Sequence, residues 1–189
     1  DQAAFEPDTA AILYTYRGYG FPLGALIPCN QLLHGAEVLQ EGLLGAAGER
    51  MLVMLPPYHI FTIVGCLLVP LLNKMTAVIP DSINPGILFE LIAAQRIDTI
   101  TAVPELYRLL AHLRNLAGSL SSLKAFVSGG SRLTAESFNE IQATFGVELM
   151  HGYGLTEFAP VSRNIRTQTR PGTIGPICSG VECKILKPD

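Results

Sequence analysis

One stretch near the carboxyl end of the chain combines residue types that could bind a nucleotide and a metal ion. It runs His151-Gly152-Tyr153-Gly154-Leu155-Thr156-Glu157. Glycines on both sides of Tyr153 let the backbone approach a flat ligand closely, so the ring can stack on a base. The hydroxyl of Thr156 can hydrogen-bond a phosphate oxygen, and the carboxylate of Glu157 can hold a hard cation such as magnesium. The spacing alone also fits a strand-to-loop turn with a surface threonine and glutamate, so both interpretations stay open.

Three further segments surround this stretch in a fixed order. Two lie upstream and one downstream: Leu55-Pro56-Pro57-Tyr58-His59-Ile60-Phe61, Ser128-Gly129-Gly130-Ser131-Arg132-Leu133 and Gly172-Thr173-Ile174-Gly175-Pro176. With all four segments the chain resembles the adenylate-forming superfamily, which includes acyl-CoA synthetases, luciferases and peptide-synthetase adenylation domains. Four motif matches in the right order are much more specific than any one of them. The Tyr-His-Ile-Phe and Glu-Phe-Ala-Pro runs are most similar to medium- and long-chain fatty acyl ligases.

The resemblance implies a role for each matching residue and a set of cofactors. The residues that would line the adenine, the ribose and part of the acyl pocket are Gly130, Ser131, Arg132, His151, Gly152, Tyr153 and Gly154. Thr156 would contact phosphate, Glu157 would ligate magnesium, and His59 would sit near the acyl carboxylate. The implied cofactors are ATP or AMP, magnesium and, in the parent enzyme, coenzyme A.

The segment that would hold the triphosphate departs from the family pattern. The family's loop, Tyr-Thr-Ser-Gly-Thr-Thr-Gly-x-Pro-Lys-Gly, corresponds here to Tyr14-Thr15-Tyr16-Arg17-Gly18-Tyr19-Gly20-Phe21-Pro22-Leu23-Gly24. Thr15 keeps its place at the nucleotide, and Arg17 could supply a replacement charge. A phosphate cradle needs exposed amides, small hydroxyl side chains and a cation, whereas Leu23 stands at the lysine position. We therefore expect this loop to be impaired in handling pyrophosphate.

Short apolar runs alternate with helical patterns along the chain. The expected strands are Ala10–Tyr14, Gly24–Ile27, Met51–Leu55, Thr76–Ile79, Asp98–Val103, Leu123–Ser128, Val147–Met150 and Val181–Leu186. The expected helices run from the N-cap Asn30 to about Leu44, over Ile60–Leu72, over Pro85–Arg96, from Pro104, and over Ala135–Phe145 between Thr134 and Gly146. This order predicts an α/β fold with a mostly parallel sheet flanked by helices, the central part of the large AMP-binding domain. The glycine turns 18–24, 129–131 and 152–154 are expected to converge where ligands bind in such sheets.

Composition narrows the class of protein. Of the 189 residues, 49% are hydrophobic and 15% are charged, which favours a buried core over disorder. The net charge of -3 and the scattered Lys and Arg argue against nucleic-acid binding. The apolar run Ile60–Leu72 is shorter than the roughly 20 residues of a membrane span. Cys29, Cys66, Cys178 and Cys183 lack zinc spacing, and we expect reduced thiols in a cytoplasmic protein.

Three hypotheses about function remain open on the sequence. In the first, residues 1–189 are part of the large domain of an ATP-dependent ligase that transfers a fatty acyl group to coenzyme A or a carrier-protein thiol. The small carboxyl-terminal domain with its catalytic lysine would then be missing, and the isolated chain would be inactive and prone to self-association. In the second, a degenerate homologue binds a nucleotide or acyl-adenylate without turnover. In the third, the chain is a structural or partner-binding lobe.

Overall fold

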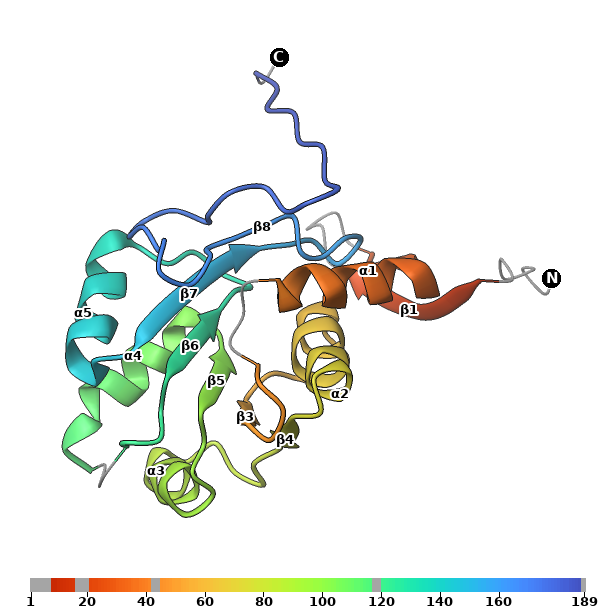
Figure 1. Ribbon diagram of the computed structural model, residues 1–189. Helices are drawn as coiled ribbons and strands as arrows, with labels where there is room; N and C mark the ends of the chain where they lie inside the picture. The colour runs from red at the N-terminus through yellow and green to blue at the C-terminus, as the bar shows by residue number, and fades with distance from the viewer. Residues whose placement is uncertain (1–7, 16–20, 42–44, 117–119, 188–189) are drawn as a thin grey trace.

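The alternating runs form a sheet with helices on both sides, which a computed structural model describes for residues 8–15, 21–41, 45–116 and 120–187 (Figure 1). The main sheet has six strands in the order β4-β3-β5-β6-β7-β8. Their bounds are β3 Arg50–Val53, β4 Thr76–Val78, β5 Thr99–Ala102, β6 Ala125–Ser128, β7 Glu148–Tyr153 and β8 Ser162–Arg163. All neighbouring strands are parallel except β7 and β8, so the predicted mostly parallel α/β sheet is confirmed.

Helices cover both faces of this sheet because successive strand residues point to opposite sides. One face packs against α3 (Pro85–Ala94), α4 (Pro104–His112) and α5 (Ala135–Phe145), and the short helix η2 (Arg114–Leu116) follows α4. The other face packs against η1 (Thr62–Leu68), which continues into α2 (Val69–Leu72). The helix α1 (Cys29–Gln40) packs on η1. Strands β5 and β6 are buried along their whole length, as expected for a parallel sheet covered on both faces.

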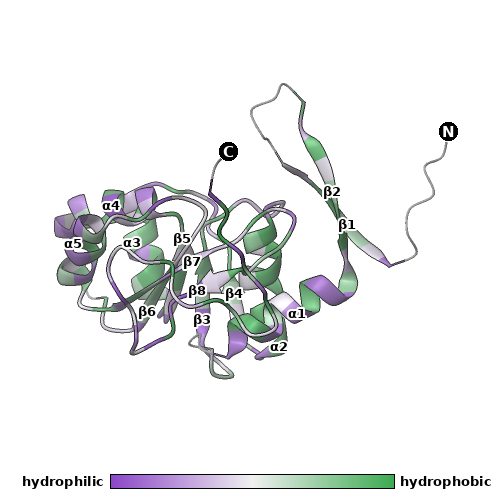
Figure 2. Ribbon diagram, turned by 90° about the horizontal axis from the view of Figure 1, so that it is seen from above, coloured by the Kyte–Doolittle hydropathy of each residue, from purple (hydrophilic) through white to green (hydrophobic). Residues whose placement is uncertain are grey.

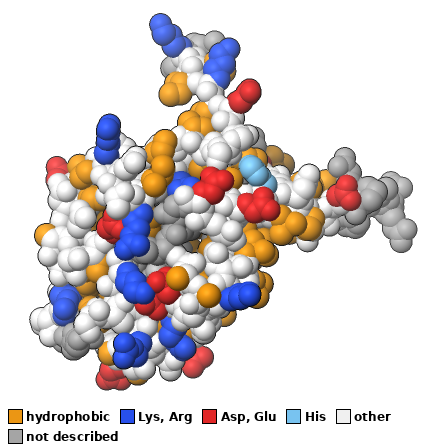
Figure 3. Space-filling model, viewed as in Figure 1, with side chains coloured by type: hydrophobic (Ala, Val, Ile, Leu, Met, Phe, Trp, Pro, Cys, Tyr) orange, Lys and Arg blue, Asp and Glu red, His pale blue; other side chains and the backbone are white. Residues whose placement is uncertain are grey.

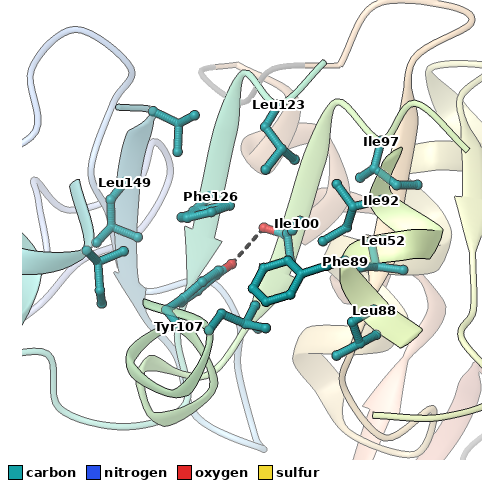
Figure 4. Packing of buried hydrophobic residues seen from close by; sticks show 14 of the residues in the cluster. Leu52, Leu88, Phe89, Ile92, Ile97, Ile100, Tyr107, Leu123, Phe126 and Leu149 are labelled. Atoms are coloured by element: carbon teal, nitrogen blue, oxygen red, sulfur yellow. Dashed lines mark hydrogen bonds between the residues drawn. The ribbon is translucent and has the colours of Figure 1, made fainter. Parts of the chain in front are cut away.

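Tyr107 of α4 fixes the distance between this helix and the sheet (Figure 4). Its ring stacks on Phe126 with 4.6 Å between the ring centroids. Its hydroxyl lies 2.7 Å from the carbonyl oxygen of Ile100 and 2.8 Å from that of Val127, and donates between them. A fully buried phenol thus finds partners in the backbone of β5 and β6, which ties α4 to these two strands.

The helix boundaries follow their capping residues in some places and not in others. Thr134 accepts a hydrogen bond from the amide of Ser137 at 3.2 Å, and Gly146 ends α5 in the left-handed conformation at φ 67°, both as predicted. The prediction of Asn30 as an N-cap is wrong, because α1 begins at Cys29 directly after Pro28. Proline fixes its own φ and cannot donate, so the helix starts at once after it. Helix α1 ends at Gln40 rather than near Leu44, and residues 42–44 lie outside the described part.

The apolar segment Ile60–Leu72 is helical as predicted, but its middle has π geometry. Residues of η1 follow the wider π spacing before α2 resumes the α-helical one. Gly65 within η1 lies against the ring of Phe61, where a β-carbon would be 3.2 Å from Cε2. Such π segments often lie at functional sites, and this one borders the cavity described below.

The strands β1 (Thr9–Thr15) and β2 (Leu23–Pro28) form a separate antiparallel hairpin. Two strands joined by a short connection pair antiparallel, so these two form a sheet of their own outside the mostly parallel one. Figure 2 shows the hairpin projecting from the body of the molecule. Tyr14, Phe21 and Leu23 are exposed on it, at 73%, 83% and 52%. Leu13 and Ile27 are buried where the hairpin meets α1.

The segment after β8 crosses the molecule without further regular strands. The predicted strand Val181–Leu186 is wrong, because these residues pair with no strand of the described chain and extend away from the body (Figure 1). Alternation alone does not make a strand where no sheet edge is within reach.

On the face in Figure 3, basic and acidic side chains are interspersed, and hydrophobic side chains are visible around α1 and β1.

Candidate active site

Two of the three glycine turns meet at the carboxyl ends of β6 and β7. Ser128, the last residue of β6, pairs with His151 of β7, so Gly129-Gly130 lie beside the last residues of β7, Gly152-Tyr153, and Gly154 follows directly. The predicted convergence is therefore confirmed for these two turns. The third turn belongs to the hairpin; its residues 16–20, including Arg17, lie outside the described part, and Thr15 does not line the cavity.

A cavity of about 60 Å³ lies between these turns, η1 and the end of α1. Its apolar lining comes from Leu39, Ile60, Phe61, Val64, Val127, Met150, Ala159 and Pro160. Its polar lining comes from His59, Ser128, His151, Tyr153, Ser162, Arg163 and Asn164, with the backbone of Gly129, Gly130, Gly152 and Gly154. By this measure a single water needs about 10–15 Å³, so the cavity has room for a small polar group or a short chain segment.

The ring of Phe61 forms the wall between η1 and the first glycine turn. A β-carbon at Gly129 would lie 3.1 Å from Cε1 of this ring, and one at Gly65 would lie 3.2 Å from Cε2. Both distances are shorter than ordinary van der Waals contact, so glycine at each position lets the ring fit between helix and strand. The sequence analysis assigned no role to Phe61, although it closes the His59 motif.

His59 stands at the rim of the cavity in a defined orientation. Its Nδ1 accepts a hydrogen bond from the amide of Phe61 at 3.2 Å, so the neutral ring carries its proton on Nε2. Its carbonyl accepts from the amides of Thr62 and Ile63 at the start of the helix. Although much of the residue faces solvent, burial of the ring lowers the pKa of His59. A neutral His59 can therefore donate from Nε2 to an oxygen in the cavity.

His151 lies deeper and is 4% exposed. Its Nδ1 is 3.2 Å from the hydroxyl of Ser128, and burial lowers the pKa of the ring. The carbonyl of His151 accepts from both the backbone amide and the side-chain amide of Asn164, each at 2.9 Å. These bonds connect the motif strand β7 to the returning segment, so His151 forms the floor of the cavity, whereas the partly exposed Tyr153 forms its rim.

The remaining predicted site residues lie outside the cavity lining. Ser131 is exposed and its hydroxyl donates to both carboxylate oxygens of Glu105, at 3.0 and 2.9 Å, and Arg132 is also exposed. Thr156 and Glu157 are half-buried in the loop after Gly154, where the carbonyl of Glu157 accepts from the side chain of Gln31 at 2.5 Å.

The loop that carries Thr156 and Glu157 is pressed onto α1. A β-carbon at Gly35 of α1 would lie 2.4 Å from the carbonyl oxygen of Ala159, so only glycine allows this approach. Ala159 and Val64 both line the cavity, and the close contact therefore places the loop at its edge.

Three residues that the sequence analysis missed contribute to the cavity from the other side. Ser162, Arg163 and Asn164 follow the loop, and the first two form β8. Their placement depends on pairing with Tyr153 and Gly152 of β7. No local sequence pattern predicts this pairing. An alternation of two residues is too short to predict a strand.

The described residues contain no group of three His, Cys, Asp or Glu side chains that could hold a metal ion, and the four cysteines are free thiols. No helix among them has the length and apolar character needed to cross a bilayer.

Comparison with known proteins identifies the relatives of this fold. The family described as AMP-binding enzyme matches residues 2–189. Acyl-CoA synthetase ALT10 of Alternaria alternata is 30% identical over 154 residues, which are 81% of this chain and 27% of that protein. A long-chain-fatty-acid–CoA ligase of Bacillus subtilis is 27% identical over 189 residues, 90% of this chain and 31% of the relative.

Solved structures agree with these relatives. The crystal structure of ATP-bound MatB from Rhodopseudomonas palustris superposes with a TM-score of 0.82 and 25% identity, covering 91% of this chain and 34% of MatB. The chain thus spans about a third of the length of the proteins that it matches.

Proposed function

The chain belongs to the AMP-binding enzyme family, and we propose that it is part of an ATP-dependent acyl-activating ligase. In the proposed reaction a carboxylate oxygen attacks the α-phosphorus of ATP. The bond between the α-phosphorus and the oxygen that bridges to the β-phosphate breaks, so acyl-adenylate and pyrophosphate form. A thiol of coenzyme A or a carrier protein then attacks the acyl carbonyl and AMP leaves. The observation that carries this proposal is the single cavity around which His59 and both glycine turns meet.

The residues of the cavity suit the acyl and adenylate side of this reaction. Nε2 of His59 would donate to an oxygen of the acyl carboxylate, because its Nδ1 is already occupied by a backbone amide. The backbone of Gly129-Gly130 and the ring of Tyr153 would border the adenylate. Preorganised donors of this kind stabilise charge that develops during the reaction without having to reorient.

Magnesium fits the carboxylate of Glu157 as a single protein ligand. Magnesium usually takes one or two carboxylates and completes its shell with water and substrate phosphate oxygens. The lack of a three-residue metal cluster in the described chain is compatible with that mode. Glu157 is half-buried on the loop that begins at the cavity rim, and Thr156 precedes it as a phosphate contact. When bound, magnesium would neutralise phosphate charge.

A fatty acid is the first substrate class proposed. The resemblance of the His59 motif to fatty acyl ligases supports it, and so does the name of the Bacillus subtilis relative. Apolar side chains of α1, η1, β6 and β7 line much of the cavity.

Reduced thiols support a cytoplasmic location, and self-association of the isolated chain stays a prediction.

The test is acid-dependent exchange of pyrophosphate into ATP by the full-length protein, followed by thioester formation with coenzyme A. We expect exchange with at least one carboxylic acid and its loss in Glu157→Gln, whereas the isolated 189-residue chain should show none. Equal activity of wild type and Glu157→Gln would contradict the proposed roles.

A second candidate, a homologue that binds acyl-adenylate without turnover, is favoured by one observation. Leu23 stands at the lysine position of the phosphate loop and lies in β2, paired with Thr15 on the projecting hairpin. Tight binding of a stable acyl-adenylate analogue, without exchange on any acid, would establish this second function and exclude the first.

A further inference from the structure

The cavity contains a cation that the proposed reaction does not use. Arg163 lies in β8 opposite Gly152 of β7. A β-carbon at Gly152 would come within 3.3 Å of the β-carbon of Arg163. Glycine at position 152 therefore leaves the arginine side chain space beside β7, where it helps to line the cavity.

Most of the hydrogen-bonding capacity of Arg163 is unused. Nη2 donates to the carbonyl oxygen of Val38 at 2.8 Å, in the last turn of α1, where carbonyls lack helical partners. Nε and Nη1 are buried and have no hydrogen-bond partner among the described residues. A guanidinium has five N–H donors, so the bond to the helix end explains only a small part of its placement.

Arg163 also forms no ion pair with a carboxylate of the described residues, whereas Lys124 pairs with Glu49 and Asp98, and Arg166 with Glu148. Glu41 lies in the same region, because its carboxylate and the guanidinium of Arg163 both act on the thiol of Cys178. Burial raises the pKa of Cys178, Arg163 lowers it, and Glu41 raises it. The carboxylate of Glu41, however, accepts from the hydroxyl of Ser179 at 2.8 Å.

A second buried donor lies at the same cavity. The hydroxyl of Ser162 is fully buried and has no hydrogen-bond partner in the described part of the chain, and Ser162 also lines the cavity. Buried polar groups of native proteins nearly always have partners, and a buried charge almost always does. Several unpaired donors at one small cavity thus indicate a ligand group that accepts hydrogen bonds and carries negative charge.

We propose that the acid substrate carries a second anionic group, a carboxylate or sulfonate, and that Arg163 binds it. This inference rests on the proposed ligase function and replaces a plain fatty acid, as its substrate class, with an acid that has two charged ends. The planar guanidinium fork matches a carboxylate or sulfonate in two parallel hydrogen bonds.

The test compares matched acids in the pyrophosphate-exchange assay of the full-length protein. The pairs are malonate with propionate, succinate with butyrate, and glutarate with pentanoate, together with sulfoacetate and a long-chain fatty acid. We expect one of the dianionic acids to have the highest kcat/KM. Arg163→Gln keeps an amide donor for Val38 but removes the charge. It should lower kcat/KM for that acid by roughly ten- to a hundredfold, because a charge-assisted hydrogen bond is lost.

Matched variants separate recognition from folding. Arg163→Lys keeps the charge without the fork and should retain part of the activity, which also covers the case that Arg163→Gln fails to fold. Arg170→Gln removes an exposed arginine from the same segment and should change nothing. Monocarboxylates should lose no activity in Arg163→Gln.

The outcomes distinguish this inference from the ligase proposal. Equal losses on mono- and dicarboxylates would overturn it, since Arg163 would then serve the reacting carboxylate or the fold. Preference for the long-chain acid with no effect of Arg163→Gln would overturn it while leaving the ligase function standing. If no acid supports exchange, the ligase proposal fails. A dicarboxylate should then still raise the melting temperature of wild type but not of Arg163→Gln, and the absence of that difference would overturn the inference.

Discussion

The cavity region and the β1–β2 hairpin carry the two halves of the expected nucleotide site, and they are built in different ways. Around the cavity, glycines sit where neighbouring backbone or ring atoms leave no space for a β-carbon. The hairpin has little core beneath it, and its large side chains Tyr14, Phe21 and Leu23 are exposed. The proposed acyl and adenylate side thus depends on packing within this chain, whereas the described strands of the hairpin, which flank the proposed triphosphate loop, are packed much less. We therefore expect substitutions near the cavity to cost much more than those on the hairpin.

The largest expected difference between the two regions comes from a pair of glycines. At Gly175 a β-carbon would lie 2.1 Å from the backbone carbonyl of Arg163, and φ is +82°. Overpacking and left-handed strain should together make Gly175→Ala cost about 3 kcal/mol or more of unfolding free energy. At Gly24 of the hairpin, a β-carbon would meet only side chains, those of Ile12 at 3.2 Å and Tyr14 at 3.7 Å. Gly24→Ala should change stability by less than about 1 kcal/mol. Denaturant unfolding of the full-length variants measures both, and similar costs would break the comparison.

The next effect concerns Asn164, which connects the segment after β8 to the motif strand. Its side-chain amide donates to the carbonyls of His151 and Thr173 at 2.9 and 3.1 Å, and its Oδ1 accepts from the amide of Arg170 at 3.2 Å. Asn164→Asp keeps the shape but removes both donors, which should cost about 2–3 kcal/mol because buried carbonyls lose partners. The melting temperature and the rate of acid-dependent pyrophosphate exchange should both fall. Asn139→Asp, at an exposed position of α5, serves as the control and should leave both unchanged.

A smaller, pH-dependent effect follows from the two histidines of the cavity. Burial lowers the pKa of both His59 and His151, so below about pH 6.5 the unfolded chain binds protons that the folded chain does not. Stability should therefore be full above that pH and should decline as the pH falls through it. His151→Gln should flatten this decline in melting curves recorded between pH 7.5 and 5.5, a range in which free histidine titrates (roughly pH 5 to 8). An unchanged slope would show that the buried ring is not the cause.

The smallest effect on stability is expected on the hairpin itself. Leu23→Lys restores the family's lysine at a half-exposed position, where surface substitutions usually change stability by less than about 0.5 kcal/mol. If the altered loop limits pyrophosphate handling, this variant should raise the exchange rate and lower the KM for ATP. A fall in the exchange rate would show that the leucine has a role of its own.

The parts of the fold that the sequence predicted are those set by neighbouring residues. Thr134 and Gly146 bound α5 as expected because a cap acts on the adjacent turn. The strands before the glycine turns were found for the same reason, and their parallel order brought two of the turns together. The error at Asn30 is also local, since Pro28 already starts the helix.

The unpredicted parts depend on contacts between distant residues. Phe61 acquires its role from Gly65 and Gly129, and Arg163 acquires its place from pairing with Gly152 and from the end of α1. The hydroxyl of Ser131 donates to Glu105 of α4, another contact between residues far apart in the sequence. No local pattern contains such pairings. The positive charge at the cavity therefore depends on where β8 pairs, which the sequence does not predict.

The most direct test of the account is the affinity of the full-length protein for a stable acyl-adenylate analogue, measured by calorimetry. Such an analogue has an acyl group and an adenosine but no triphosphate tail, so it should need the cavity and not the hairpin. Gly129→Val, which fills space beside Phe61, should weaken binding by roughly a hundredfold, about 2.8 kcal/mol, while Leu23→Lys should leave it unchanged. Undiminished affinity in Gly129→Val, or a loss of affinity in Leu23→Lys alone, would contradict the assignment of the acyl-adenylate to this cavity.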